Sequence, residues 1–221
     1  TPDVPLRSRV AAGKSGYLQV VAYGQLVDYA AEHDLLIRLR QRPGHFLLAG
    51  QCLADVSHRD PAPADLAEAL RAAVVIGHQR TPTQDLEYSV RQLVEIAVRA
   101  LSPGISDPFT AIGVVHKLGA AIELLQDRVL PPADRLDDSG TLRLVASVST
   151  IAGIVDAAFD QIRQAATDRG DVAVLVALAR SLGQLGAIAP PGDACDALRR
   201  QLTMLARSGP AKVVDEADRA D

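Results

Sequence analysis

Aromatic residues are scarce in this chain, and tryptophan is absent. Only 3% of the 221 residues are aromatic, so the core has to be built from aliphatic side chains, and an aromatic stacking surface for bases is not expected. The formal net charge is −4, so the chain has no overall excess of basic residues of the kind found in nucleic-acid-binding proteins. We therefore expect no nucleic-acid partner, whereas the 48% of apolar residues indicate a folded globular protein.

Residue patterns that bind metals or form familiar catalytic sites are also missing. The two cysteines, Cys52 and Cys195, do not form a C-x-x-C pair, and the histidines show no H-x-x-x-H or H-x-H spacing. Walker A, G-x-G-x-x-G and G-x-S-x-G motifs are absent. We therefore expect no metal, no cofactor and no identifiable catalytic residue. No run of 18 or more apolar residues occurs, so a membrane span is not expected within the chain.

Composition and periodicity divide the chain into four parts and predict an α+β fold. Residues 1–14 are expected to be a linker and residues 209–221 an acidic flexible tail. Residues 15–79 are expected to form a small β-rich unit with one or two helices. Residues 80–208 are expected to form a mostly α-helical bundle.

The β-rich unit is expected from alternating and β-branched segments. Strand patterns occur at 15–23, 35–40 and 46–56, around a short helix at 24–33. A turn at 41–45 contains Pro-Gly, in which proline presets φ and glycine permits the reversal. This order is similar to half of a lipoyl-type barrel-sandwich, although the turn carries no modifiable lysine. Further strands are expected at 74–78 and 141–147, and the expected long helices are 83–101, 107–127, 149–167, 171–188 and 193–207.

The helix expected at 83–101 is apolar over more than half of its circumference and carries one narrow polar stripe. Within the stripe, Arg91, Glu95 and Arg99 are spaced four residues apart, so opposite charges meet on successive turns. The stripe is either a solvated ladder of ion pairs or the lining of a cleft or interface. Its members are Gln84, Asp85, Tyr88, Arg91, Gln92, Glu95 and Arg99.

A sharp corner is expected after this helix. The Ser102-Pro103-Gly104 sequence cannot continue a helix, and Asp107-Pro108 has the pattern of an N-cap followed by a first helical residue. The hydroxyls of Ser102, Ser106 and Thr110 lie nearby in sequence. The corner is either a well-capped helical hairpin or a helix start whose free N–H groups receive an anion.

A second polar stripe follows the apolar face of the helix at 149–167. It contains Asp156, Asp160, Arg163 and Gln164. Asp160 and Arg163 either pair with the polar cluster at 80–110 or belong to a plain amphipathic surface.

The segment 80–111 resembles the signature of a family of bacterial predicted membrane proteins, the domain-of-unknown-function family 2254. Further matches are SGYLQ at 15–19, R-P-G-x-F at 42–46 and AFDQIRQ at 158–164, and the resemblance covers about residues 15–190. Ser106, Glu95 and the pair Tyr88-Ser89 depart from the usual Asn, Asp and Phe-Gly. The signature, which takes any aromatic residue at 88 and any acidic residue at 95, falls on Arg80, Thr81, Gln84, Asp85, Tyr88, Arg91, Gln92, Glu95, Arg99, Ser102, Pro103, Gly104, Asp107, Pro108, Thr110 and Ala111.

The resemblance implies a soluble domain of an integral membrane protein whose transmembrane helices lie outside this chain. Two functions follow as hypotheses. In the first, a self-associating domain on the cytoplasmic side of the cell membrane regulates its own transmembrane region and senses a small anionic or polar ligand. In the second, an enzyme of hydrolase or transferase type uses Asp85 or Glu95 as base and Arg91 or Arg99 as electrostatic stabiliser. The expected ligand-binding or structural network is Arg80, Thr81, Gln84, Asp85, Arg91, Gln92, Glu95, Arg99, Ser102, Asp107 and Thr110.

Overall fold

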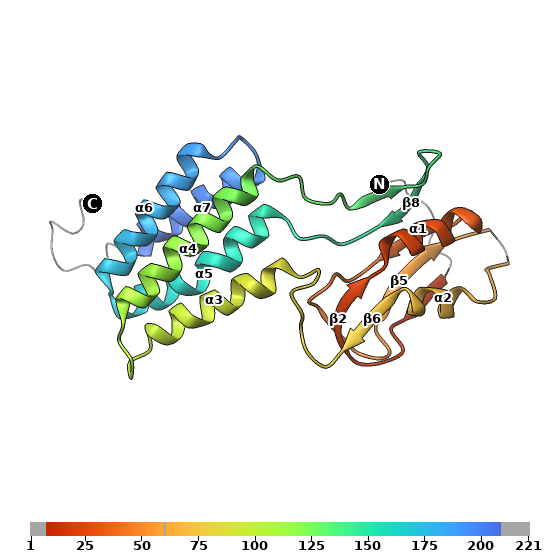
Figure 1. Cartoon of the computed structure of the whole chain (residues 1–221), viewed down its shortest axis with the longest axis horizontal. Coiled ribbons are helices and arrows are strands. Elements are labelled where there is room, and N and C mark those ends of the chain that lie inside the picture. The colour runs from red at the N-terminus through yellow and green to blue at the C-terminus, as the bar shows by residue number, and fades with distance from the viewer. Residues whose placement is uncertain (1–7, 60, 209–221) are drawn as a thin grey trace. The chain divides into compact units, whose positions relative to one another are not determined.

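The computed structural model describes residues 8–59 and 61–208 and divides the chain into two compact units (Figure 1). Unit 1 comprises Thr1–Tyr88 and Leu130–Ser149, and unit 2 comprises Ser89–Val129 and Thr150–Asp221. Unit 1 holds the strands and two helices, and unit 2 is helical, which confirms the α+β class. The expected tail at 209–221 lies outside the described residues.

The strands of unit 1 form two sheets. The larger sheet has the order β1-β5-β3-β8-β7, and the smaller one has the order β4-β2-β6. All neighbouring pairs are antiparallel except β3 and β8, which run parallel. The strands are β1 (Ser8–Ala11), β2 (Gly16–Val21), β3 (Leu36–Leu39), β4 (Phe46–Leu47), β5 (Cys52–Ser57), β6 (Val74–Gly77), β7 (Asp134–Leu136) and β8 (Leu142–Val145).

An aliphatic core joins the sheets of unit 1 to two helices, α1 (Tyr23–Glu32) and α2 (Leu66–Ala72). Leu26 and Ala30 of α1 are buried, and so is Leu70 of α2. They share one cluster with strand residues such as Ile37 and Val56. Among the residues that the structure describes, this cluster has no fully buried aromatic side chain, as the low aromatic content predicts.

Three segments of unit 1 differ from the sequence-based division. Residues 8–11, within the expected linker, form β1 and pair with β5. Residues 80–88 and 130–149, which the boundary at 79/80 places with the helices, belong to unit 1. The segment 130–149 does so because β8 pairs with β3 across about 100 residues of sequence. The periodicity of a short sequence segment cannot predict a pairing between strands so far apart in the chain.

The described part of unit 2, up to residue 208, is built from five helices that bury a second aliphatic core. α4 packs against α6, and α5 packs against α7. Phe159 of α5 is fully buried in this core. The helices are α3 (Leu86–Ala100, whose first three residues belong to unit 1), α4 (Pro108–Gln126), α5 (Ile151–Arg169), α6 (Val172–Ile188) and α7 (Asp193–Ser208).

Helix ends in unit 2 follow the expected cap chemistry. The side chains of Asp107, Thr150 and Asp171 each accept a hydrogen bond from the backbone three residues later. Gly170 ends α5 with φ of 65°, in the left-handed region that favours glycine. The expected long helices are thereby confirmed to within a few residues.

By length and composition, α4 can cross a membrane, which the search for unbroken apolar runs did not predict. About a third of its most apolar window is buried. Core helices of water-soluble proteins pass the same test. Ala111, Val115 and Leu118 of α4 indeed lie in the core of unit 2.

Candidate functional site

The turn that leads into β4 and the segment that leads into α3 meet within unit 1. Gly44, at the tip of the turn, donates its N–H to the Leu18 carbonyl at 2.8 Å. Its φ of 94° lies in the left-handed region. A Cβ at this position would overlap the Asp85 carboxylate, since even the farther oxygen, Oδ1, would lie only 2.9 Å away. The R-P-G-x-F turn therefore requires glycine for conformation and for space.

Asp85 is the centre of the site and is only 1% exposed. Its Oδ2 accepts from Arg80 Nε at 2.8 Å and lies 2.7 Å from Arg80 Nη2. Its Oδ1 accepts from the Tyr88 backbone N–H at 3.1 Å, which caps the start of α3. Arg80 also lies over the Tyr88 ring, 5.3 Å from the centroid. Both carboxylate oxygens of Asp85 are thus held by protein donors.

A second buried ion pair lies beside the first. Glu87 is 6% exposed, and its Oε1 accepts from Arg42 Nη2 at 2.7 Å. Arg42 also donates from Nη1 to the Ser149 hydroxyl at 2.9 Å. Arg42 therefore ties the turn, the first turn of α3 and the end of the segment 130–149 together. We call Arg42, Arg80, Asp85 and Glu87 the paired network.

His45 is flanked by the paired network. Burial is the main cause that lowers the pKa of His45, and the Arg42 guanidinium lowers it further, against the opposing effect of Glu87 and Asp85. Its Nδ1 lies 2.6 Å from Gln41 Oε1. A lowered pKa keeps this imidazole neutral at neutral pH.

Gln84 binds the end of β2. Its side chain accepts from the Val21 N–H at 2.9 Å and donates to the Val21 carbonyl at 3.2 Å. It thus satisfies both backbone groups of a strand residue, as a neighbouring strand would. Thr81 lies in the same segment, and its Oγ1 is buried with no hydrogen-bond partner within the described residues.

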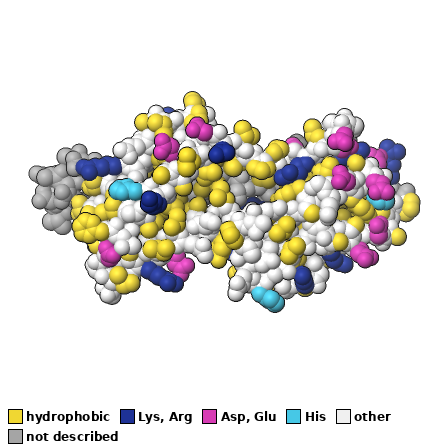
Figure 2. Space-filling view, in the orientation of Figure 1, with side chains coloured by type: hydrophobic (Ala, Val, Ile, Leu, Met, Phe, Trp, Pro, Cys, Tyr) yellow, Lys and Arg dark blue, Asp and Glu magenta, His cyan; other side chains and the backbone are white. Residues whose placement is uncertain are grey.

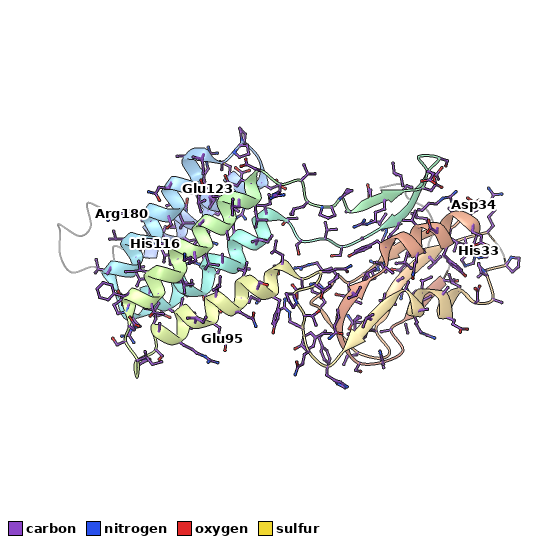
Figure 3. All side chains as sticks on the ribbon, viewed as in Figure 1. His33, Asp34, Glu95, His116, Glu123 and Arg180 are labelled. Atoms are coloured by element: carbon purple, nitrogen blue, oxygen red, sulfur yellow. The ribbon has the colours of Figure 1, made fainter. Side chains whose placement is uncertain are left out.

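The remaining polar residues of α3 belong to unit 2 and are exposed. Arg91, Gln92 and Glu95 lie on the surface, and Glu95 projects from α3 in Figure 3. Glu95 Oε1 accepts from Arg99 Nη2 at 2.5 Å, and the two side chains are 61% and 72% exposed. The predicted stripe therefore divides into the buried Asp85 before the helix and an exposed ladder along it, whereas Gln84 is exposed and Tyr88 is half-buried.

The corner between α3 and α4 is a capped hairpin. Asp107 accepts from the Thr110 N–H at 3.1 Å and from the Thr110 hydroxyl at 2.5 Å. The hydrogen bond from the Thr110 hydroxyl lowers the pKa of Asp107 most, and the bond from the Thr110 N–H lowers it further. Ser106, with φ of 52°, accepts from Arg169 Nη2 at 3.0 Å. The Asp107 carboxylate thus occupies the Thr110 N–H, a donor that a bound anion would otherwise use. The prediction of Asp107 as N-cap is confirmed. The backbone carbonyl of Ser102 accepts from the Ser106 N–H.

The second polar stripe pairs with α7. Arg163 is 8% exposed and donates from Nε to Gln201 Oε1 at 3.2 Å. The fully buried Gln201 donates from Nε2 to Asp156 and Asp160 at 2.9 Å each. Arg163 also donates from Nη2 to Asp160 Oδ1 at 3.1 Å, and Gln201 of α7 joins this pair. Asp160 is 42% exposed, as on an amphipathic surface, whereas Arg163 is buried against α7.

Sequence reasoning missed Arg42, Glu87 and Gln201 as members of these clusters. The R-P-G-x-F turn was a signal for Arg42, but nothing local indicates which carboxylate it binds. Within residues 8–59 and 61–208 no group of three or more His, Cys, Asp or Glu side chains is arranged to hold a metal ion.

Comparison with known proteins identifies the family. Residues 2–184 match the model of the family described as predicted membrane protein (DUF2254). Uncharacterized proteins of Mycobacterium tuberculosis and Mycobacterium bovis are 33% identical over 226 residues, covering 100% of this chain and 43% of their own length. No solved structure matches. The chain spans less than half the length of these relatives, and it belongs to the DUF2254 family of predicted membrane proteins.

Proposed function

We propose that this chain is a soluble, non-enzymatic domain that regulates the membrane-spanning part of its own protein from the cytoplasmic side. Support for the membrane context comes from the family, a family of predicted membrane proteins. More than half of the length of the curated relatives lies outside the matched region, which leaves room for a membrane part.

The observation that carries the non-enzymatic role is that both carboxylates of the paired network are buried and bound to arginines. An acid–base catalyst needs a group that can reach the substrate. Asp85 is 1% exposed and accepts from Arg80 and from the Tyr88 N–H. Glu95 and Arg99 are exposed and paired to each other in unit 2. The geometry gives no support to a hydrolase or transferase built on Asp85, Arg91, Glu95 and Arg99.

We further propose that the domain forms a homo-oligomer through unit 2. Large apolar side chains are exposed there, and Figure 2 shows hydrophobic side chains gathered over the helices of unit 2. Phe109 is 84% exposed, Leu124 70% and Ile105 61%. Large exposed apolar side chains at the corner before α4 and along α4 favour an association surface.

Sedimentation velocity at rising protein concentration tests the assembly. The wild-type chain is expected to form a dimer or larger oligomer, and Phe109→Ser is expected to shift the population toward monomer. Leu48→Ser is the matched control, because Leu48 is 62% exposed in unit 1 and is not part of the proposed surface. A wild-type chain that stays monomeric at the highest concentration would contradict self-association.

A thermal-shift screen tests the sensing role separately. Small polar and anionic compounds are expected to raise the melting temperature if one of them binds the folded domain. If no compound raises the melting temperature, the result argues against ligand sensing and leaves the assembly test unaffected.

The cytoplasmic side is tested by protease digestion of right-side-out and inverted vesicles that contain the full-length protein. Cleavage of the domain is expected only in inverted vesicles.

A further inference from the structure

Three arginines share one face of the larger sheet of unit 1. In the register of the sheet, Asp55 of β5 stands opposite Arg9 of β1 on one side and opposite Arg38 of β3 on the other. Directly opposed residues project from the same face of a sheet. Arg40 follows two residues after Arg38 and therefore points to that face as well. The face thus concentrates three guanidinium groups around one carboxylate.

The buried carboxylate neutralises only part of this charge. Asp55 is fully buried. Its Oδ1 lies 3.3 Å from Arg9 Nε, and its Oδ2 is bound by Arg40 Nε. Among the residues that the structure describes in this row of the sheet, the one further carboxylate is Asp134, opposite Val145, and it stands two strands, about 10 Å, from Arg38. In the described part of the sheet, three arginines therefore stand around one adjacent carboxylate.

The donors on this face are not all used. Arg38 Nε is buried and has no hydrogen-bond partner within the described residues. The side chains of Arg9 and Arg40 are 79% and 44% exposed, so they remain reachable from solvent. Each guanidinium carries five N–H donors in a planar fork. A buried donor without a partner calls for an explanation, and a bound ion is one of the ordinary explanations.

We propose that this face, formed by Arg9, Arg38 and Arg40 around Asp55, binds a multiply charged phosphate group. Guanidinium forks match the oxygen geometry of phosphate through paired N–H donors, and charge assistance makes these hydrogen bonds strong. Asp55 orients Arg9 and Arg40 through their Nε atoms. Arg38 then supplies the donor that lacks a protein acceptor. The phosphate is carried either by a soluble molecule or by a lipid headgroup.

Calorimetric titration with pyrophosphate tests the site in solution. Sodium chloride at matched ionic strength measures general screening. The wild-type chain is expected to bind pyrophosphate saturably, and Arg38→Gln is expected to weaken binding about tenfold or more, as for the loss of a charge-assisted hydrogen bond. Arg199→Gln is the control, because Arg199 is a 72% exposed arginine on α7 of unit 2.

Two further variants keep the test decisive if Arg38→Gln unfolds. Arg9→Gln changes a mostly exposed side chain and is expected to weaken binding with little change in circular dichroism. Arg38→Lys keeps the charge but loses the fork, and it is expected to bind more weakly than wild type. Equal binding by all variants, or heat that chloride reproduces, would overturn the proposal.

Vesicle co-sedimentation separates the two sources of phosphate. Vesicles of phosphatidylcholine are compared with vesicles that also contain phosphatidic acid, whose headgroup is a phosphomonoester. Binding to the second type, lost in Arg9→Gln, assigns the site to a lipid headgroup. Binding of pyrophosphate without vesicle binding assigns it to a soluble ligand. Absence of both would overturn the proposal, whatever the oligomeric state of the chain.

Discussion

The start of α3 and the remainder of that helix carry the same types of charged side chain in opposite environments. Asp85 and Glu87 are buried and bind Arg80 and Arg42 within unit 1. Glu95 is exposed and binds Arg99 within unit 2. A helix wheel places Asp85 and Glu95 in one stripe, but their energetic roles differ because burial makes the loss of a partner costly, whereas solvent screens an exposed pair.

Removal of the central carboxylate should have the largest effect. Asp85→Ala leaves Arg80, whose side chain is 21% exposed, without its partner and removes the cap of α3. We expect a loss of about 4 kcal/mol, of which about 1 kcal/mol is the cap, measured by urea unfolding. Asp85→Asn keeps the capping oxygen and should recover only the smaller part. An Asp85→Ala variant as stable as wild type would show that the buried and exposed carboxylates are equivalent.

A methyl group added at Gly44 should also disturb the Asp85 carboxylate. Gly44→Ala requires a left-handed alanine and pushes against Asp85. We expect a loss of about 3 kcal/mol, the sum of the backbone cost and the overpacking cost. Gly50→Ala is the control, since Gly50 has open space around its Cα and no φ in the left-handed region. Equal stability of the two alanine variants would contradict the close approach of Gly44 and Asp85.

Acid should reveal the cap at Asp107 in unit 2. Its pKa is lowered in the folded state by the hydroxyl and N–H of Thr110, so the folded state favours the ionised form. The stabilisation is fully present above the unfolded pKa of about 4 and is lost as the pH falls through the lower folded pKa. Asp107→Ala should thus lower the melting temperature at pH 7, by less than Gly44→Ala, and the difference from wild type should shrink below pH 4. A difference that stays constant down to low pH would exclude the ionised cap.

The exposed ladder should give the smallest effect. Glu95→Ala breaks a pair whose side chains are 61% and 72% exposed, and we expect a change of a few tenths of a kcal/mol. The change should decrease further in high salt because screening weakens exposed pairs. Double-mutant cycles with Arg99→Ala measure the pair directly. A coupling as large as that between Asp85 and Arg80 would remove the distinction between the two groups.

Sequence alone predicted the helices of unit 2 well because their signals are local. Asp107-Pro108 marks a helix start, and Gly170 follows a helix end. The strand β1 was missed because Val10 is its only buried residue and its pairing with β5 is distant. The paired network was found only in part, since Arg42 stands 45 residues before Glu87. Periodicity identifies which face of a helix is polar, but the partner of each polar group depends on chain segments far away in sequence.

The link between Gln84 and Val21 has a consequence for how the small sheet of unit 1 opens. On the edge of β2 that faces away from β6, the turn satisfies Leu18, and the Gln84 amide satisfies Val21. Val21 faces Val74 of β6 on one side, but on the other side its backbone N–H and carbonyl are bound by a single side chain and not by a strand. Hydrogen exchange at the Val21 amide should follow excursions of the segment that precedes α3, whereas amides between β2 and β6 should follow the sheet. The exchange rate of the Val21 amide thus reports how often the segment that holds Asp85 opens.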